Sequence, residues 1–143
     1  MDRQKVLAIV GPTGIGKTSL SVWLAKQLNG EIISCDSMQV YKKMDVGTAK
    51  VTKEEMQDIH HELIDVQNYD EPYNVKVFQE KCRKAIEDVV KRGKFPILCG
   101  GTGLYIQSVL SNFEYTNVPV NEKLRAELIT QTHENLITHF HDL

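Results

Sequence analysis

Residues 11–18 carry the strongest chemical signal in the sequence. They fit the pattern G-x-x-x-x-G-K-[ST] of a loop that binds phosphate groups. Glycines let backbone N–H groups curl around a polyphosphate, and the start of the following helix adds positive potential. In such a loop the lysine pairs with phosphate oxygens and the last hydroxyl is offered to Mg²⁺; the alternative is a glycine-rich turn that binds nothing. The loop consists of Gly11, Pro12, Thr13, Gly14, Ile15, Gly16, Lys17 and Thr18.

Asp36 is the second candidate for chemistry, because it follows a short apolar stretch and opens the segment 36–41, Asp-Ser-Met-Gln-Val-Tyr. Three roles are open from the pattern: a Mg²⁺ ligand, a general base, or a cap for its own loop. An ATPase or GTPase normally adds an acidic residue at the end of another strand. Here the apolar run 95–99 continues into Gly-Gly-Thr-Gly at 100–103 without an acid. The motif therefore indicates a diphosphate-like ligand rather than ATP hydrolysis.

Other reactive side chains favour plainer interpretations. Adjacent His60 and His61 cannot chelate a metal as an i, i+4 pair does, so a structural role is expected. Cys35, beside Asp36, has no evident base partner and is expected to be a packed thiol rather than a nucleophile. A basic cluster follows the Asp36 loop and is either a solvated surface or a contact to an RNA backbone. Its members are Lys42, Lys43, Lys50 and Lys53.

The elements that must position these residues alternate between strands and helices. Short apolar runs at 6–10, 31–35 and 95–99 predict buried parallel strands, and 62–66 an extended stretch. Helices are expected at 17–28, where leucines recur, at 53–59 after a Thr52–Glu55 capping box, at 74–92 and at 104–110. The apolar residues of the 74–92 helix fall on one face, which consists of Val75, Phe78, Cys82, Ile86 and Val89. After residue 121 two amphipathic pieces follow, the first with Leu124, Leu128 and Ile129 inward and the second with Leu136, Ile137 and Phe140. This order predicts an α/β fold whose ligands bind at the carboxyl ends of the strands.

Composition bounds the remaining choices. The chain has 143 residues with a formal net charge of -2, and 41% of its residues are hydrophobic. This describes a globular domain and excludes a disordered chain and a strongly basic nucleic-acid coat; no apolar run is long enough for a membrane span. Three cysteines without C-x-x-C spacing favour reduced thiols in the cytoplasm. The last 33 residues hold two basic and five acidic side chains, so we expect a core at 1–112 and a separate segment at 113–143.

Five motifs that follow one another in order carry a family resemblance. The chain resembles the tRNA dimethylallyltransferases, also called tRNA isopentenyltransferases, over roughly residues 5–130. The phosphate loop alone is generic, whereas the five motifs in this order are highly specific. They are the segments 11–18, 36–41, 44–50 (Met-Asp-Val-Gly-Thr-Ala-Lys), 60–65 (His-His-Glu-Leu-Ile-Asp) and 100–105 (Gly-Gly-Thr-Gly-Leu-Tyr).

The resemblance implies a P-loop NTPase-like parallel sheet flanked by helices, with the start of a helical insertion that binds tRNA. It also implies transfer of a dimethylallyl group from dimethylallyl diphosphate to N6 of an adenosine next to the tRNA anticodon, with Mg²⁺ as cofactor. By resemblance Asp36 is the base, and Thr13 and Lys17 act near the diphosphate. A cytoplasmic enzyme that is monomeric at full length, with no membrane partner, is expected. The tRNA-binding positions implied are Asp36, Ser37, Met38, Gln39, Thr102 and Arg125.

Members of this family are longer than 143 residues, so we expect this chain to be an N-terminal portion that lacks part of the helical insertion and a later arginine. The activity of the short form is left open. Three alternatives also remain: an adenylate isopentenyltransferase that acts on free nucleotides, a P-loop small-molecule kinase that binds ATP, and a non-catalytic fragment that holds diphosphate or RNA.

Overall fold

A computed structural model of the chain describes residues 3–43, 50–111, 113–116 and 118–141. The chain divides into two compact units, Met1–Phe113 and Glu114–Leu143, which are described separately. Residue 112, where the sequence places the domain boundary, lies outside the described residues, as does the 44–49 part of the third family motif.

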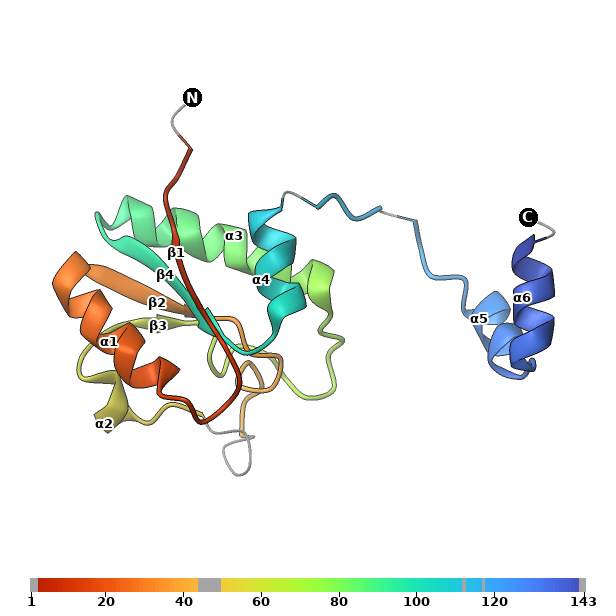
Figure 1. Ribbon diagram of the computed structural model, residues 1–143, viewed down its shortest axis with the longest axis horizontal. Helices are drawn as coiled ribbons and strands as arrows, with labels where there is room; N and C mark the ends of the chain where they lie inside the picture. Colours follow the sequence, from red (N-terminus) through yellow and green to blue (C-terminus); the bar gives the residue numbers. More distant parts are fainter. Residues whose placement is uncertain (1–2, 44–49, 112, 117, 142–143) are drawn as a thin grey trace. The chain divides into compact units, whose positions relative to one another are not determined.

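A parallel four-stranded sheet forms the centre of the first unit (Figure 1). The strands β1 (Leu7–Val10), β2 (Gly30–Ser34), β3 (His61–Glu62) and β4 (Phe95–Gly100) lie in the order β1-β4-β2-β3. All three strand pairs are parallel. The expected α/β fold is therefore confirmed, and strands distant in sequence end at one edge of the sheet.

Helices cover both faces of this sheet (Figure 1). The first unit contains α1 (Lys17–Leu28), α2 (Lys53–Met56), α3 (Val75–Lys91) and α4 (Gly103–Leu110). Successive strand residues point to opposite faces, so Ile33 and Leu98 pack with α3 and α4, while Ile32 and Ile97 pack with α1. Two apolar layers result, one on each side of the sheet.

The spacing of apolar residues predicts the buried face of α3 better than that of α1. In α3 the predicted apolar face is confirmed, because Phe78, Cys82 and Val89 are fully buried. Of the recurring leucines in α1, Leu24 is partly buried and packs against the sheet, whereas Leu20 and Leu28 are 47% and 43% exposed. Its buried residues are Ser21, Val22 and Ala25. Small side chains let the helix lie close to the sheet, where longer ones would hold it away.

Two expected elements are shorter than predicted. The helix after the Thr52 capping box ends at Met56 rather than at 59, because Gln57 and Asp58 adopt left-handed φ values of 46° and 65°. The extended stretch expected at 62–66 is a strand only at His61–Glu62. Leu63 and Asp65, with φ of 62° and 56°, turn the chain away from the sheet.

The second unit is a pair of helices, α5 (Glu122–Ile129) and α6 (His133–His141). Asn121 caps α5 by accepting a hydrogen bond from the Leu124 amide at 3.0 Å. The expected inward face is wrong in part, because Leu124 is 43% and Ile129 75% exposed, and Phe140 of α6 is also 75% exposed. Two helices of eight and nine residues have too little surface to enclose each other's apolar sides. None of the described helices is long and apolar enough to cross a membrane.

Candidate active site

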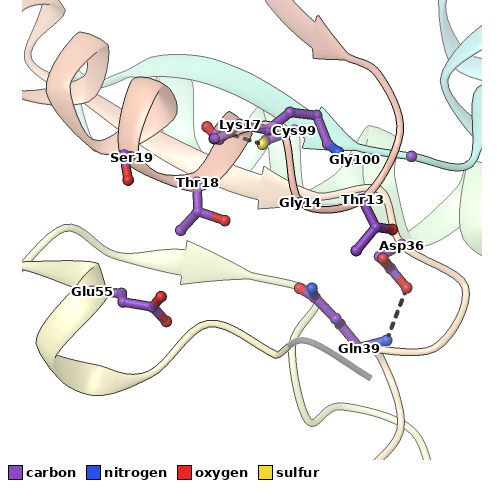
Figure 2. Close-up of a pocket in the computed structure, with 12 residues that line it drawn as sticks. Thr13, Gly14, Lys17, Thr18, Ser19, Asp36, Gln39, Glu55, Cys99 and Gly100 are labelled. Atoms are coloured by element: carbon purple, nitrogen blue, oxygen red, sulfur yellow. Dashed lines mark hydrogen bonds between the residues drawn. The ribbon is translucent and has the colours of Figure 1, made fainter. Parts of the chain in front are cut away.

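A cavity of about 280 Å³ lies at the carboxyl ends of the strands, where the sequence places ligands (Figure 2). Its wall is formed by the phosphate loop between β1 and α1, by Asp36 and Gln39 after β2, and by the end of β4. These segments lie far apart in the sequence, and parallel pairing of β1 and β2 with β4 brings them together. The lining residues are Thr13, Gly14, Gly16, Lys17, Thr18, Ser19, Asp36, Gln39, Glu55, Cys99, Gly100 and Gly101.

The phosphate loop needs its glycines. Gly14 and Gly16 have φ of 84° and 91°, in the left-handed region that residues with a Cβ rarely adopt. Gly16 also precedes α1 and has no side chain to cap it, so the first amides of the helix remain available to a ligand. The Lys17 ammonium donates a hydrogen bond of 2.5 Å to the carbonyl of Pro12, within its own loop. A phosphate ligand would have to draw Lys17 away from that carbonyl.

Asp36 caps its own loop. Its Oδ1 accepts hydrogen bonds from the amides of Met38 at 2.8 Å and Gln39 at 3.2 Å. Within the described parts of the chain Oδ2 accepts none. The loop-cap role that the pattern left open is therefore present, and it uses one of the two carboxylate oxygens. The other oxygen leaves the base and ligand roles open to the same residue.

The other predicted residues of the Asp36 loop are held around it. The Ser37 amide donates to the Thr102 hydroxyl at 3.3 Å, which joins this loop to the turn before α4. The Ser34 hydroxyl donates to the Gln39 side-chain carbonyl at 3.4 Å. Met38 is 44% exposed. The structure thus brings Ser37, Gln39 and Thr102 to Asp36, although 65 residues separate Ser37 from Thr102.

Residues 39–143 match the family model described as IPP transferase. The chain belongs to the IPP transferase family. It is 59% identical over 117 residues to a tRNA dimethylallyltransferase of Bacillus anthracis.

Solved structures show the same relationship. The chain is similar to a full-length tRNA isopentenylpyrophosphate transferase of Bacillus halodurans, with a TM-score of 0.79 and 49% identity over 88% of this chain. It is also similar to a eukaryotic dimethylallyltransferase that acts on tRNA, with a TM-score of 0.76 and 37% identity over 85% of this chain. The matched region is 37% of the Bacillus anthracis protein, 42% of the Bacillus halodurans chain and 31% of the eukaryotic one. The chain therefore spans less than half the length of these members of the IPP transferase family.

Glu55 lines the cavity but was missed as a site residue by sequence reasoning. Its Oε2 accepts a hydrogen bond from the Thr52 amide at 2.8 Å, as the capping box predicts. Figure 2 shows the carboxylate on α2 across the cavity from Thr18. The available signal was the capping box, which assigns a local role and does not reveal that α2 faces the phosphate loop.

The cysteines are packed thiols. Cys35 and Cys82 are fully buried, and Cys99 is half-buried. A side-chain hydrogen bond with Cys82, together with burial, raises the pKa of Cys35 well above its ordinary value. Burial likewise raises the pKa of Cys99. A protonated thiol is a poor nucleophile, so the structure favours the packing role predicted for Cys35.

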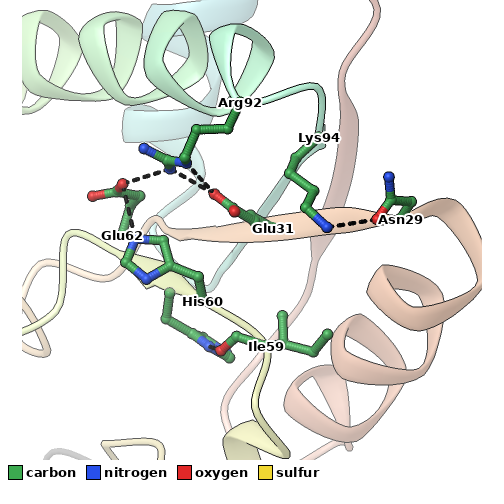
Figure 3. Close-up of polar contacts among 8 residues, drawn as sticks. Asn29, Glu31, Ile59, His60, Glu62, Arg92 and Lys94 are labelled. Carbon is green, nitrogen blue, oxygen red and sulfur yellow. Dashed lines mark hydrogen bonds and ion pairs between the residues drawn. The ribbon is translucent and has the colours of Figure 1, made fainter.

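His60 belongs to a polar cluster near the amino end of β2 (Figure 3). The Arg92 guanidinium donates to Glu31 at 2.5 and 3.0 Å and to Glu62 at 2.9 Å, and His60 lies 3.0 Å from Glu62. His61 Nδ1 lies 2.9 Å from the Ile59 carbonyl. Because Arg92 donates to both carboxylates, the described contacts of the group form an ion-pair network. The predicted structural role of the histidines is supported.

The basic cluster predicted after the Asp36 loop is not uniform. Lys42, Lys43 and Lys53 are exposed, whereas the Lys50 side chain is only 7% exposed. Its ammonium donates to the Tyr41 carbonyl at 2.9 Å and pairs with the carboxylate of Asp65. The solvated-surface interpretation is therefore wrong for Lys50.

Arg125 belongs to the second unit. It lines an apolar groove of that unit with Leu124, Leu128 and Leu136, among others. Its assignment to tRNA stays a prediction.

Proposed function

We propose that this chain supplies the diphosphate-binding and acceptor-binding part of a tRNA dimethylallyltransferase. The reaction moves a dimethylallyl group from dimethylallyl diphosphate to N6 of an adenosine next to the tRNA anticodon. One observation carries the proposal: in a member of the IPP transferase family, a phosphate loop and a half-free carboxylate line the same cavity. A donor diphosphate and an acceptor amine have to meet in such a place.

The proposed chemistry is a substitution at the first carbon of the dimethylallyl group. The bond from that carbon to the diphosphate oxygen breaks, the bond to N6 forms, and diphosphate leaves with the electron pair. The adenine amine is a weak nucleophile because its lone pair is delocalised into the ring. Asp36 takes the N6 proton on Oδ2, while the amides of Met38 and Gln39 hold Oδ1 and thereby orient the carboxylate.

The leaving group is bound by the phosphate loop in this proposal. The loop amides and Lys17 hold the diphosphate, with Thr13 beside it, and Lys17 exchanges the Pro12 carbonyl for a phosphate oxygen. The Thr18 hydroxyl and the carboxylates of Asp36 and Glu55 line the same cavity, and oxygen donors of this kind suit Mg²⁺. Mg²⁺, when bound through Thr18, offsets the negative charge that builds up on the diphosphate.

The acceptor is proposed to be a base in a single-stranded loop. N6 becomes accessible only when the adenosine leaves its stack, which costs a few kcal/mol and least in a loop. Ser37, Met38, Gln39 and Thr102 surround Asp36 and would hold that base. Met38 is exposed at this edge and offers a flexible apolar side chain for contact with it.

The test is transfer of labelled dimethylallyl to a tRNA anticodon stem-loop in the presence of Mg²⁺. It is carried out with this chain and with a chimera in which the chain replaces the matching part of the Bacillus anthracis relative. Asp36→Asn keeps an oxygen for the Met38 and Gln39 amides but removes the base; at least a 100-fold loss of transfer is expected from the chimera. Asp70→Asn, at an exposed position away from the cavity, is the matched control.

Three results would contradict the proposal. Full activity of Asp36→Asn would remove the base assignment. Transfer to free AMP in preference to the stem-loop would indicate an adenylate isopentenyltransferase. ATP turnover without transfer of dimethylallyl would indicate a kinase.

A further inference from the structure

Lys50 has a buried side chain near the candidate site, and it has two described partners on different segments. The Tyr41 carbonyl belongs to the end of the loop that starts at Asp36, and Asp65 belongs to the turn that follows β3. The Lys50 side chain is 7% exposed, whereas that of Asp65 is 52% exposed. A lysine is buried to this degree only when its charge is matched, so the two contacts are specific rather than incidental.

The two segments that Lys50 joins are already paired along their backbones. The Val66 and Gln67 amides donate to the Val40 carbonyl at 2.9 and 3.0 Å. The Lys42 amide donates to the Gln67 carbonyl at 2.9 Å, and the Asp65 amide to the Gln39 carbonyl at 3.2 Å. The Lys50 ammonium adds a further link between the same two segments, because it contacts both the Tyr41 carbonyl and the Asp65 carboxylate.

The same backbone pairing leads back to the carboxylate of Asp36. Gln39 donates its amide to Asp36 Oδ1 and accepts from the Asp65 amide with its carbonyl. A shift of the 65–67 turn would therefore move Gln39, and with it one of the two amides that orient Asp36. The path from Lys50 to Asp36 runs through two hydrogen-bonded residues, Asp65 and Gln39.

We propose that Lys50 is a positioning residue, which holds the Asp36–Tyr41 loop against the turn after β3 and so sets the orientation of the Asp36 carboxylate. This role rests on the proposed function for its catalytic meaning, since Asp36 is the proposed base. Lys50 is not among the residues that line the candidate cavity, so the proposed role does not require it to touch the diphosphate or the acceptor base. It is distinct from the exposed lysines Lys42, Lys43 and Lys53, which remain candidates for contact with an RNA backbone.

The first test measures amide hydrogen exchange in this chain. Lys50→Met removes the charge but keeps an unbranched side chain of similar length; exchange at the Val66 and Gln67 amides is expected to become about 10- to 100-fold faster. The Cys35 amide, which bonds the Cys99 carbonyl within the sheet at 2.8 Å, should be unchanged. Lys50→Arg should restore slow exchange, and Lys53→Met, at an exposed position on α2, should have no effect.

The second test separates a positioning role from an RNA contact. In the chimera described above, Lys50→Met is expected to lower kcat for transfer about 10-fold or more with KM for dimethylallyl diphosphate unchanged. The salt dependence of stem-loop binding should keep its slope, because no phosphate contact is lost. A slope reduced by about 1, with unchanged exchange, would assign Lys50 to an RNA phosphate and overturn the proposal.

Two further outcomes of these experiments also have a defined meaning. If Lys50→Met fails to fold, Asp65→Asn serves instead, because it removes the ion pair and leaves the Tyr41 contact; unchanged exchange at Val66 in that variant overturns the proposal. If the unsubstituted chimera transfers no dimethylallyl, the proposed function fails. The exchange result then still decides whether Lys50 holds the loop.

Discussion

A methyl group added at Gly100 should displace the backbone next to Asp36 and so disturb the candidate site. Gly100 is the last residue of β4, and its position next to β2 leaves no room for a side chain: a Cβ would overlap the backbone carbonyl of Cys35. Backbone atoms in a hydrogen-bonded sheet cannot move aside as a flexible side chain can. Cys35 directly precedes Asp36, so the displacement would reach the proposed base.

The expected cost follows from the kind of clash. Forcing an additional carbon into a well-packed position typically costs about 1–3 kcal/mol. For a unit of this size each kcal/mol lowers the midpoint of thermal unfolding by about 4 °C, so Gly100→Ala should unfold about 4–12 °C earlier. Far-UV circular dichroism of this chain measures the midpoint, and the chimera measures the transfer rate, which should fall more than the stability alone explains.

Gly103→Ala is the matched control for this experiment. Gly103 is the first residue of α4, and nothing lies within 4 Å of the position that its Cβ would take. Alanine favours a helix over glycine by up to about 1 kcal/mol, so this variant should be as stable as the parent chain or slightly more so. An unfolding midpoint of Gly100→Ala equal to that of Gly103→Ala would refute the reasoning about the close approach of β4 and β2.

Two other predictions concern charge. Lys17→Met should weaken the binding of dimethylallyl diphosphate by about 10- to 100-fold in titration calorimetry, because it removes a charge-assisted hydrogen bond. Lys91→Met, at an exposed position of α3, is the control. Equal affinities of the two variants for dimethylallyl diphosphate would show that Lys17 does not hold it. Acid should destabilise the fold in two pH ranges. Burial lowers the pKa of His61 from its ordinary 6.5. The contribution of neutral His61 to the free energy of unfolding is therefore present above pH 6.5 and is lost as pH falls through the folded-state pKa. Burial raises the pKa of Glu62, but hydrogen bonds from His60 and Arg92 outweigh it and hold the pKa below its ordinary 4.5, so this contribution is lost further down, below pH 4.5. Urea unfolding at a series of pH values should show each loss disappear in His61→Gln and Glu62→Gln respectively, and an unchanged pH profile in both variants would contradict the assignment.

Much of the fold could be predicted because its signals are local. The phosphate loop lies within eight consecutive residues, and the start of α3 follows from Asn74, whose side chain accepts from the Val77 amide at 3.0 Å. The apolar periodicity of α3 also predicted its packed face, because Phe78, Cys82 and Val89 are buried in one apolar cluster with residues of the sheet. In α1 the same reasoning selected three leucines of which only Leu24 packs against the core, because the buried residues of this helix are Ser21, Val22 and Ala25.

The sequence by itself determined that a segment with the pattern of a phosphate-binding loop joins a strand to a helix, and that a carboxylate follows another strand in an α/β fold. Only the tertiary structure decided that Lys50 is a buried link rather than a surface cation, and that Glu55 shares a cavity with Thr18. It also decided that Arg92 donates hydrogen bonds to the carboxylates of Glu31 and Glu62, close to His60. The physical reason is that caps, turns and periodicity depend on residues a few positions apart. The environment of a charge depends on which distant strands pair, and 61 residues separate Arg92 from Glu31.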